Sequence, residues 1–329
     1  MKTELLKLMR CPTTGQRLTL EADLDNSHLI DVGWLVSEDG QHRYPLLNGI
    51  PRFVPEFNYA DNFGMQWNHF RQTQLDSHSG LPISTDRFWL ATGWSPADLK
   101  DQWVLDAGCG AGRFAEVALN AGAKLVALDY SSAVDACYAN LKHHPNLHVV
   151  QGDIYALPFA LGAFPFVYSL GVLQHTPDVA KAFAALPPMV QGGGGKLCAD
   201  FYWKRFRTLL HAKYLFRPFT KHMAQPKLFG LLERWIPSLL AVSQTLGRVP
   251  LVGRVLKRLV PVADYTGIFP LSEQQLKEWA LLDTFDMLAP TYDNPQSAAT
   301  VQRWFEEAKL LDIEVGHWGH LVGRGKKLG

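Results

Sequence analysis

Residues 104–114 read VLDAGCGAGRF and predict a buried strand that runs directly into a glycine turn and a helix. Glycines at positions 108, 110 and 112 let the backbone pass within contact distance of a ligand and place N–H groups at the helix start. A nicotinamide dinucleotide fingerprint needs its third glycine at position 113, but that residue is arginine. The spacing therefore favours a cofactor without a pyrophosphate and argues against a dehydrogenase.

Apolar strands and amphipathic helices alternate regularly after this segment, which is typical of a parallel sheet covered by helices on both faces. Near the C-terminus a helix at 297–309 precedes strands at 311–315 and 320–322, and residues 316–319 predict the turn of an antiparallel hairpin. We expect an α/β fold with a Rossmann-like, doubly wound, seven-stranded, mostly parallel sheet, plus a small β-rich N-terminal domain and a helical insertion. The other expected strands are 103–107, 124–128, 147–151, 166–170 and 196–201, and the helices between them are 112–121, 132–142 and 177–185.

Acidic residues follow two neighbouring strands of this expected sheet. Asp129 lies about twenty residues after the glycine turn, where a carboxylate can accept hydrogen bonds from both hydroxyls of a ribose. Asp153 and Ile154 follow the next strand and supply an acid and an apolar side chain suited to an adenine amino group and ring face. The pattern indicates a cofactor with ribose and adenine parts.

Four segments, in this order and spacing, resemble the class I S-adenosylmethionine-dependent methyltransferases of the type 11 group: VLDAGCGAGRF, VALDYS, VVQGDIYALPF and YSLGVLQHTPD. The resemblance covers residues 100–203 and the C-terminal hairpin. It implies S-adenosylmethionine as the cofactor, with its methionine part at residues 108–110, its amino group near Asp106 and its sulfonium beside residues 170–171. The implied cofactor-binding residues are Asp106, Gly108, Cys109, Gly110, Asp129, Tyr130, Asp153, Ile154, Leu170 and Gly171.

Candidate residues for methyl transfer follow the fourth and fifth strands and the insertion. Transfer to a hydroxyl needs a base, whereas transfer to an amine, thiol or carbanion needs less help. His175 lies at the carboxyl edge of the expected sheet and is the candidate base, although a scaffold hydrogen bond in the strand-to-helix turn is the alternative. Tyr202 and Tyr292 are candidate substrate-binding residues, with a packing role open for each.

Residues 1–56 predict a β-rich accessory domain, and residues 57–100 a helical linker that packs on the core. MRCPTTGQRL at 9–18 and YPLLNGIPRFVPE at 44–56 resemble a Trm112-like domain. The zinc form of that family has a second cysteine near the first, whereas PTT follows Cys11, so no metal is expected. Phe63, Trp67 and Phe70 have helical spacing, which fits helices packing on the core or a contact with ligand.

The core is expected at 101–203 and 295–329, interrupted by a helical cap at 204–294. From 204 to 258 twelve cations face the single anion Glu233, a formal charge of +11 in a chain whose total is +1. Apolar residues between the prolines predict several short amphipathic helices. The cations are Lys204, Arg205, Arg207, Lys213, Arg217, Lys221, Lys227, Arg234, Arg248, Arg254, Lys257 and Arg258.

Such a cap could grip an anionic small-molecule or lipid-linked acceptor, lie on an anionic membrane or bind RNA; solvated cations are the plain alternative. RNA is the least favoured partner because no RNA-binding module is apparent. Residues 1–16 lack the apolar core of a secretory signal, so we expect a cytoplasmic protein, with peripheral contact at the inner membrane surface as an option.

We expect methyl transfer from S-adenosylmethionine to oxygen of a small-molecule, glycan or lipid-linked acceptor. One alternative is methylation of RNA or a translation factor. The other is a cofactor-binding scaffold without turnover.

The change Asp129→Ala should abolish cofactor binding because a paired contact to the ribose hydroxyls is lost. Isothermal titration calorimetry with S-adenosylmethionine measures the effect. A near-native dissociation constant in the variant would remove Asp129 from the cofactor site.

Overall fold

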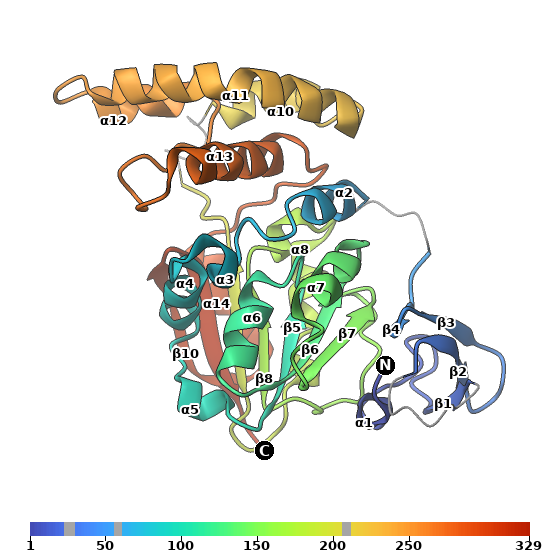
Figure 1. The fold of residues 1–329 in the computed structure, drawn as a ribbon. Coiled ribbons are helices and arrows are strands. Elements are labelled where there is room, and N and C mark those ends of the chain that lie inside the picture. Colours follow the sequence, from blue (N-terminus) through green and yellow to red (C-terminus); the bar gives the residue numbers. More distant parts are fainter. Residues whose placement is uncertain (23–29, 56–60, 206–211) are drawn as a thin grey trace.

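The computed structural model describes residues 1–22, 30–55, 61–205 and 212–329, and it confirms the expected α/β fold (Figure 1). Its central sheet has seven strands in the order β10-β11-β9-β8-β5-β6-β7. Five of them pair in parallel, and the C-terminal hairpin adds two antiparallel strands at one edge. The strands are β5 (Trp103–Ala107), β6 (Lys124–Asp129), β7 (Leu147–Gln151), β8 (Phe166–Ser169), β9 (Lys196–Phe201), β10 (Leu310–Trp318) and β11 (His320–Lys327).

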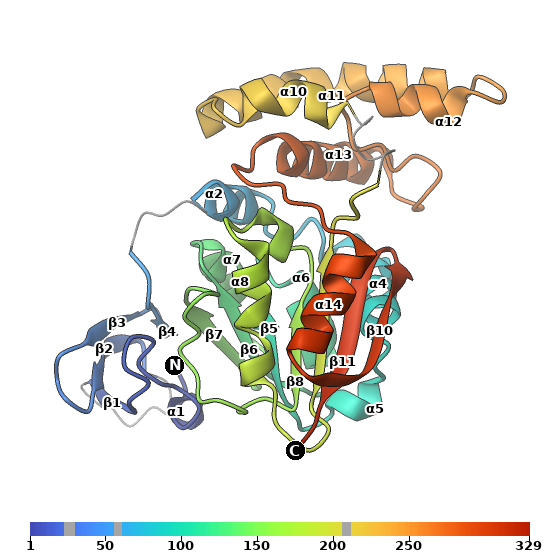
Figure 2. The ribbon, with the colours of Figure 1, turned by 180° about the vertical axis from the view of Figure 1, so that it is seen from behind.

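The parallel strands are buried on both faces, which explains their nearly continuous apolar sequence. Along β5, Val104 belongs to one apolar cluster and Leu105 to the cluster on the other face, as the alternation of a strand requires. Helices α4 (Ile83–Thr92), α6 (Arg113–Asn120) and α7 (Ala133–Leu141) cover the first face. Figure 2 shows α8 (Val179–Ala184) and α14 (Ala298–Glu307) over the second face.

The strand order reverses at β5, which pairs with β6 on one side and with β8 on the other. The connections that leave β5 and β8 therefore diverge, and a crevice opens at the carboxyl ends of these strands. The glycine turn, residues 108–112, occupies this edge. Gly108 has φ +100°, and a Cβ there would lie 2.4 Å from a methyl group of Val172, so close approach of the two loops requires glycine.

The sequence predicted the turn of the C-terminal hairpin at residues 316–319. This prediction is wrong for Gly316, which lies within strand β10. Strand β10 continues to Trp318, which pairs with His320, and only Gly319 lies in the turn, with φ +78°. Gly316 instead pairs with Val322. A Cβ on Gly316 would lie 2.7 Å from the Trp318 ring, so the glycine makes room for an indole rather than for a turn.

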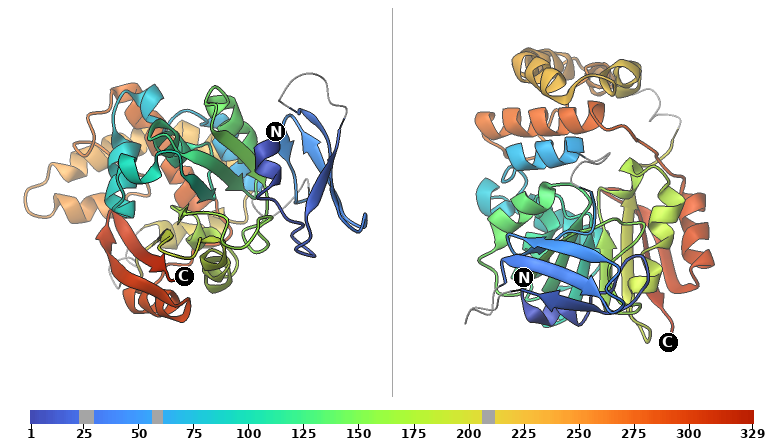
Figure 3. Two further views of the ribbon diagram at one scale, coloured as in Figure 1. Left: turned by 90° about the horizontal axis from the view of Figure 1, so that it is seen from below. Right: turned by 90° about the vertical axis from the view of Figure 1, so that its right-hand side faces the viewer.

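The N-terminal residues form a separate four-stranded antiparallel sheet, as expected (Figure 3). Apolar side chains of this sheet and of α1 (Thr3–Leu6) join the cluster on the α8 and α14 face. Arg52 attaches the unit to the core: its guanidinium donates to Asp135 Oδ1 at 2.6 Å and to Gln151 Oε1 at 2.7 Å. The strands are β1 (Leu18–Glu21), β2 (Val32–Ser37), β3 (Arg43–Leu47) and β4 (Ile50–Pro51).

Four helices follow the N-terminal sheet and lead into β5. Phe70, just after the first of them, is buried and packs against Phe229 of the insertion, with ring centroids 5.7 Å apart. This contact of Phe70 is with the insertion, whereas the sequence suggested packing on the core. The helices are α2 (Asp61–His69), α3 (Asp76–Ser79), α4 and α5 (Pro96–Leu99).

The insertion is helical, but the expectation of several short helices is wrong for its longest one. Helix α11 (Gln225–Gly247) runs through Pro237 without ending. Pro237 is exposed, whereas Leu232, Ile236 and Leu240 are buried on the side of α11 that packs against α13 (Glu273–Leu288). The backbone hydrogen bond that proline cannot make therefore lies on the side that faces water, and packing on α13 keeps the helix continuous. The other elements are α10 (Lys213–Thr220), α12 (Gly253–Leu256), the 3₁₀ turn Lys257–Leu259 and α13 (Glu273–Leu288); Arg207 lies outside the described residues.

No helix within the described ranges is long and apolar enough to span a bilayer. Residues 154–176 contain no Lys, Arg, Asp or Glu, and they include the buried strand β8.

A buried ion cluster holds α10 in place. Asp293, after α13, is 3% exposed and lies 3.0 Å from Lys213 Nζ and 3.8 Å from Arg217 Nε. The Arg217 guanidinium also donates to the carbonyl oxygens of Met287 and Pro290, at 3.1 and 2.9 Å. These contacts satisfy two buried cations of the insertion, so the charge of this segment is only partly free.

The change Asp293→Ala should destabilise the protein by about 3–5 kcal/mol, because it leaves two buried cations without their anion. Glu21→Ala is the matched control: Glu21 pairs with Arg43 on the surface, and its loss should cost less than about 1 kcal/mol. Chemical denaturation of both variants measures the free energy of unfolding. Equal, small losses would show that the Asp293 cluster does not hold the insertion.

Candidate active site

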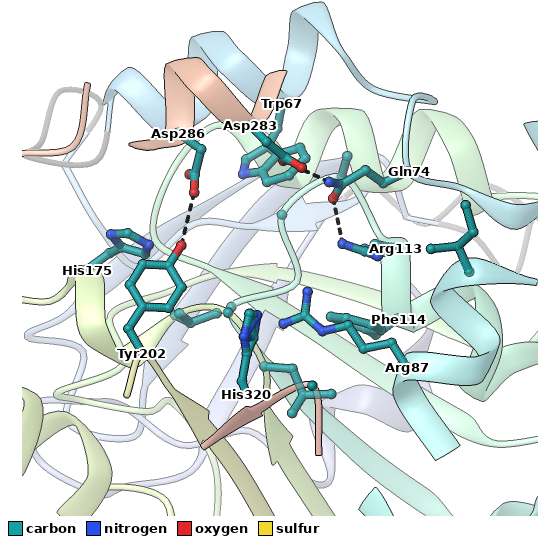
Figure 4. A pocket seen from close by; sticks show the side chains of 18 of the residues that line it. Trp67, Gln74, Arg87, Arg113, Phe114, His175, Tyr202, Asp283, Asp286 and His320 are labelled. Carbon is teal, nitrogen blue, oxygen red and sulfur yellow. Dashed lines mark hydrogen bonds between the residues drawn. The ribbon is translucent and has the colours of Figure 1, made fainter. Parts of the chain in front are cut away.

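A cavity of about 1270 Å³ lies at the carboxyl edge of the sheet, between the core and the insertion. It exceeds the 300–1,000 Å³ common for a site that holds one small molecule, so it has room for a cofactor and an acceptor. Figure 4 shows side chains from helices, strand ends and the insertion pointing into it. Its walls come from the glycine turn, the ends of β6, β8 and β9, helices α2 and α4, the hairpin turn, and α13.

The glycine turn forms one end of the cavity, where Gly108, Cys109 and Gly110 line it. A Cβ on Gly110 would lie 3.3 Å from the Trp67 ring, so a side chain there would fill the space between the turn and α2. A hydrogen bond with Cys137, together with burial, raises the pKa of the Cys109 thiol, which keeps it protonated. The turn therefore contributes backbone groups to the cavity wall rather than a reactive side chain.

Asp129 lines the same end and is held by its neighbours. Its Oδ2 accepts from the Gly110 N–H at 2.9 Å, and its Oδ1 accepts from the N–H and hydroxyl of Ser131 at 2.9 and 2.7 Å. Burial raises the pKa of this carboxyl in spite of these bonds. Tyr130, which follows Asp129 in the chain, and Ile154, which follows β7, also line the cavity.

Asp106 and Asp153 are not among the residues that line the cavity. Asp106 is buried, and its Oδ2 has no hydrogen-bond partner. Burial raises the pKa of Asp106 to about 8. Asp153 accepts from the Tyr155 N–H at 2.9 Å, and burial raises its pKa. A cationic group placed beside Asp106 would compensate its buried carboxylate.

His175 lines the cavity from the 3₁₀ turn Leu173–His175 after β8. Its Nδ1 lies 3.1 Å from the backbone oxygen of Tyr292. Because a carbonyl oxygen only accepts, Nδ1 carries the proton in the neutral ring, and Nε2 keeps its lone pair. The rings of Phe63 and Tyr202 flank the imidazole, with centroids 5.4 and 5.3 Å away. The arrangement orients an imidazole that can accept a proton.

The two tyrosines expected to bind substrate have different positions. Tyr202, after β9, lines the cavity and donates its hydroxyl to Asp286 Oδ2 of α13 at 3.3 Å (Figure 4). Burial raises the pKa of Tyr202 well above its usual value, so the hydroxyl stays a donor. Tyr292 is not among the lining residues and contributes its backbone oxygen to His175. The aromatics Phe63 and Trp67 of α2 line the cavity rather than packing only on the core.

Two arginines in the cavity wall were not singled out from the sequence as site residues. The Arg87 guanidinium of α4 lies 2.8 Å from Asp200 Oδ2. Arg113 donates to Ser84 Oγ at 2.9 Å and to Gln74 Oε1 at 3.0 Å, and burial lowers its pKa to about 10. Both guanidinium carbons lie close to the Phe114 ring, at 5.2 and 5.1 Å from its centroid. They give one wall of the cavity a positive character.

Helix α13 contributes Asp283 and Asp286 to the cavity, and the Gln74 side chain bridges Asp283 and Arg113. Asp283 accepts from the Tyr265 hydroxyl and from Gln74 Nε2 at 3.1 Å, and burial raises its pKa to about 6. His320 of β11 completes the wall, and burial lowers its pKa to about 4. No local pattern marked these residues, because they lie far apart in the chain and meet only when the insertion folds over the core.

No group of three or more histidine, cysteine, aspartate or glutamate side chains that could hold a metal ion occurs in the part of the chain described.

Residues 105–197 match the family model described as a methyltransferase domain. Demethylmenaquinone methyltransferase of Renibacterium salmoninarum is 32% identical over 119 residues, 35% of this chain and 49% of the relative. Malonyl-[acyl-carrier protein] O-methyltransferase of Pseudescherichia vulneris is 35% identical over 36% of this chain and 45% of the relative. The human N-acetylserotonin methyltransferase structure covers 84% of this chain and 61% of that chain at 12% identity, with a TM-score of 0.46. The chain thus spans less than half the length of these two curated relatives.

Residues 105–197 of the core are accordingly similar to a methyltransferase domain, for which S-adenosylmethionine is the cofactor expected from the sequence. The site fits this cofactor in three respects. Gly108 and Gly110 of the turn line the cavity with their backbone, Asp129 presents a carboxylate at the cavity surface, and Asp106 has an unpartnered buried oxygen suited to an ammonium group.

The low pKa of His320 makes stability depend on pH. The folded pKa, about 4, lies below the ordinary histidine value of 6.5, so the stability that the neutral ring contributes is complete above pH 6.5 and is lost as pH falls toward 4. We expect the wild-type protein to lose about 2–3 kcal/mol relative to His320→Gln between pH 7 and pH 4. Chemical denaturation across this range measures the difference. Parallel stability curves would show that His320 titrates normally.

Proposed function

We propose that this protein transfers the methyl group of S-adenosylmethionine to a hydroxyl oxygen of a small-molecule acceptor. One observation carries the proposal. A single cavity joins the glycine turn and Asp129 at one end to His175, Tyr202 and the insertion at the other. Alignment of two bound molecules and exclusion of water are the main tasks of an enzyme in such a displacement.

The cofactor end of the cavity follows from the glycine turn and the strand ends. Residues 108–110 would hold the methionine part, Asp129 with Tyr130 the ribose, and Asp153 with Ile154 the adenine. Leu170 and Gly171 line the cavity after β8, where the sulfonium side is expected. When bound, the cofactor supplies an electrophilic methyl group whose leaving group becomes neutral, so no general acid is needed.

His175 is the proposed base. The Tyr292 carbonyl keeps the proton on Nδ1, so Nε2 can accept the proton that an acceptor hydroxyl loses. Phe63 and Tyr202 hold the ring on two sides. Tyr292 thus positions the base through its backbone, and Tyr202 with Asp286 offers polar contacts to the acceptor.

The acceptor end combines aromatic walls with charge. Tyr265, Phe269 and Trp279 of the insertion line it together with Arg87 and Arg113, and the Arg113 guanidinium lies 5.6 Å from the centroid of the Trp279 ring. An acceptor with an apolar or aromatic body and an anionic group fits these walls, whether it is a free small molecule, a glycan or a lipid-linked one.

The N-terminal sheet is assigned by proposal as a Trm112-like accessory domain at residues 1–56. Helices at 57–100 join it to the core at 101–203 and 295–329, and residues 204–294 form the cap. The antiparallel sheet and its Arg52 contacts to the core support a separate unit with a fixed attachment.

The proposal is tested in two steps, by calorimetry with S-adenosylmethionine and then by S-adenosylhomocysteine release with a panel of acceptors. The panel contains phenolic acids, quinols, glycans, transfer RNA and a translation factor. Turnover on an anionic hydroxyl compound supports the proposal. Tight cofactor binding without turnover on any acceptor would indicate a scaffold, and transfer to RNA or protein would replace the small-molecule assignment.

The change His175→Ala should lower kcat about 100-fold or more, because the acceptor proton loses its base, while cofactor affinity changes little. His143→Ala, at an exposed position, is the matched control and should keep the wild-type rate. Steady-state kinetics and calorimetry measure the two effects. An unchanged kcat at every pH would show that His175 has only a structural role.

A further inference from the structure

Helix α10 has its polar and apolar sides inverted. Its cations Lys213 and Arg217 are buried against Asp293, whereas Leu215 and Phe219 are 70% and 75% exposed. A helix on the surface of a soluble domain normally buries its apolar side and exposes its charges. The ion pairs with Asp293 fix this orientation, so the apolar side of α10 faces outward.

The neighbouring helix α11 also exposes apolar residues. Its inner side packs on α13, but Leu231, Trp235 and Val242 are exposed. At about 100° per residue these three positions lie within about 40° of one another around the helix axis. They form a stripe beside the exposed cations Lys227 and Arg234.

The segment after α11 continues the pattern. Leu251 is fully exposed, and Val255 of α12 and Leu259 of the 3₁₀ turn are also exposed. Figures 1 and 3 show α10, α11 and α12 together as the outermost layer of the molecule, on the far side of α13 from the sheet. We call the exposed apolar and cationic side chains of this layer the outer face. Its residues include Leu215, Phe216, Phe219, Leu231, Trp235, Val242, Leu251, Val255, Leu259, Lys227, Arg234 and Arg248.

The outer face is positively charged. Lys213, Arg217 and Lys257 pair with Asp293 or Asp264, whereas Lys227, Arg234 and Arg248 are exposed. Residues 204–258 as a whole carry twelve cations and one anion, in a chain whose total charge is +1. The rest of the protein is therefore acidic. This separation of charge would orient the outer face toward an anionic surface and the rest of the molecule away from it.

We propose that the outer face docks on an anionic lipid bilayer, with its apolar side chains in the interfacial region and its cations among lipid headgroups. Exposed aliphatic and aromatic residues interspersed with Lys and Arg have the composition that interfacial helices require. A second copy of this chain fits poorly because two faces of this charge repel each other. RNA fits less well because most of the exposed apolar residues are aliphatic and cannot stack on bases.

Docking would also place the cavity close to the membrane. Arg258, which follows α12, lines the cavity, so the segment that carries the outer face also reaches the site. The docking surface is nevertheless separate from the proposed cofactor residues and the proposed base. Its occupancy can be measured without any acceptor.

The test is cosedimentation of the full chain with vesicles of phosphatidylcholine alone or with about 30% phosphatidylglycerol. We expect binding to the anionic vesicles and little to the neutral ones. Leu215→Ser combined with Phe219→Ser should weaken binding about tenfold or more, because two inserted apolar side chains are lost. Leu161→Ser, at a 77% exposed leucine outside the insertion, is the matched control and should bind as wild type.

A second variant tests the charge: Lys227→Gln, Arg234→Gln and Arg248→Gln together should abolish the preference for anionic vesicles. Thermal unfolding and calorimetry with S-adenosylmethionine show whether each variant keeps its fold and cofactor site. Wild-type protein that stays in the supernatant overturns the proposal, as does binding that neither variant weakens. A dimer that Leu215→Ser and Phe219→Ser dissociate would identify a second copy as the occupant. Charge-dependent binding of single-stranded RNA without vesicle binding would identify a nucleic acid.

Discussion

The close approach of two backbone loops at the carboxyl edge of the sheet is the constraint on which the site depends. Gly108 donates its N–H to the Leu128 oxygen at 2.7 Å and has Val172 directly against its Cα, where no side chain could fit. This contact brings together the ends of β5, β6 and β8. Asp129 and His175 then face the same cavity because their strands end at the same edge.

The insertion completes the site and is itself organised by a buried charge. Asp293 compensates Lys213 and Arg217, and this cluster determines which side of α10 faces inward. Helix α13 lies between this outer layer and the core, where it supplies Asp283 and Asp286 to the cavity. The same segment therefore closes the cavity on one side and presents an apolar, cationic surface on the other. The two roles share a scaffold but use different side chains.

The local sequence pattern predicted the strands of the core but not the residues that form the walls of the cavity. Strands β7 and β9 have the predicted bounds, because apolar runs bounded by turns are a local signal. Gly316 and Pro237 were misassigned because both were treated as interruptions. The first accommodates the Trp318 ring within a strand, and the second lies on the exposed side of a helix held by packing. Arg87, Asp283 and His320 carry no local signature at all.

The α/β alternation, the glycine turn and the acids at the ends of β6 and β7 could be predicted from the sequence, because each depends on residues near one another in the chain. The charge of +11 between residues 204 and 258 could be counted there as well. Which of those cations are buried against Asp293 and which are exposed became clear only in the folded protein. Burial and partner choice depend on contacts between distant segments, and composition contains no information about them.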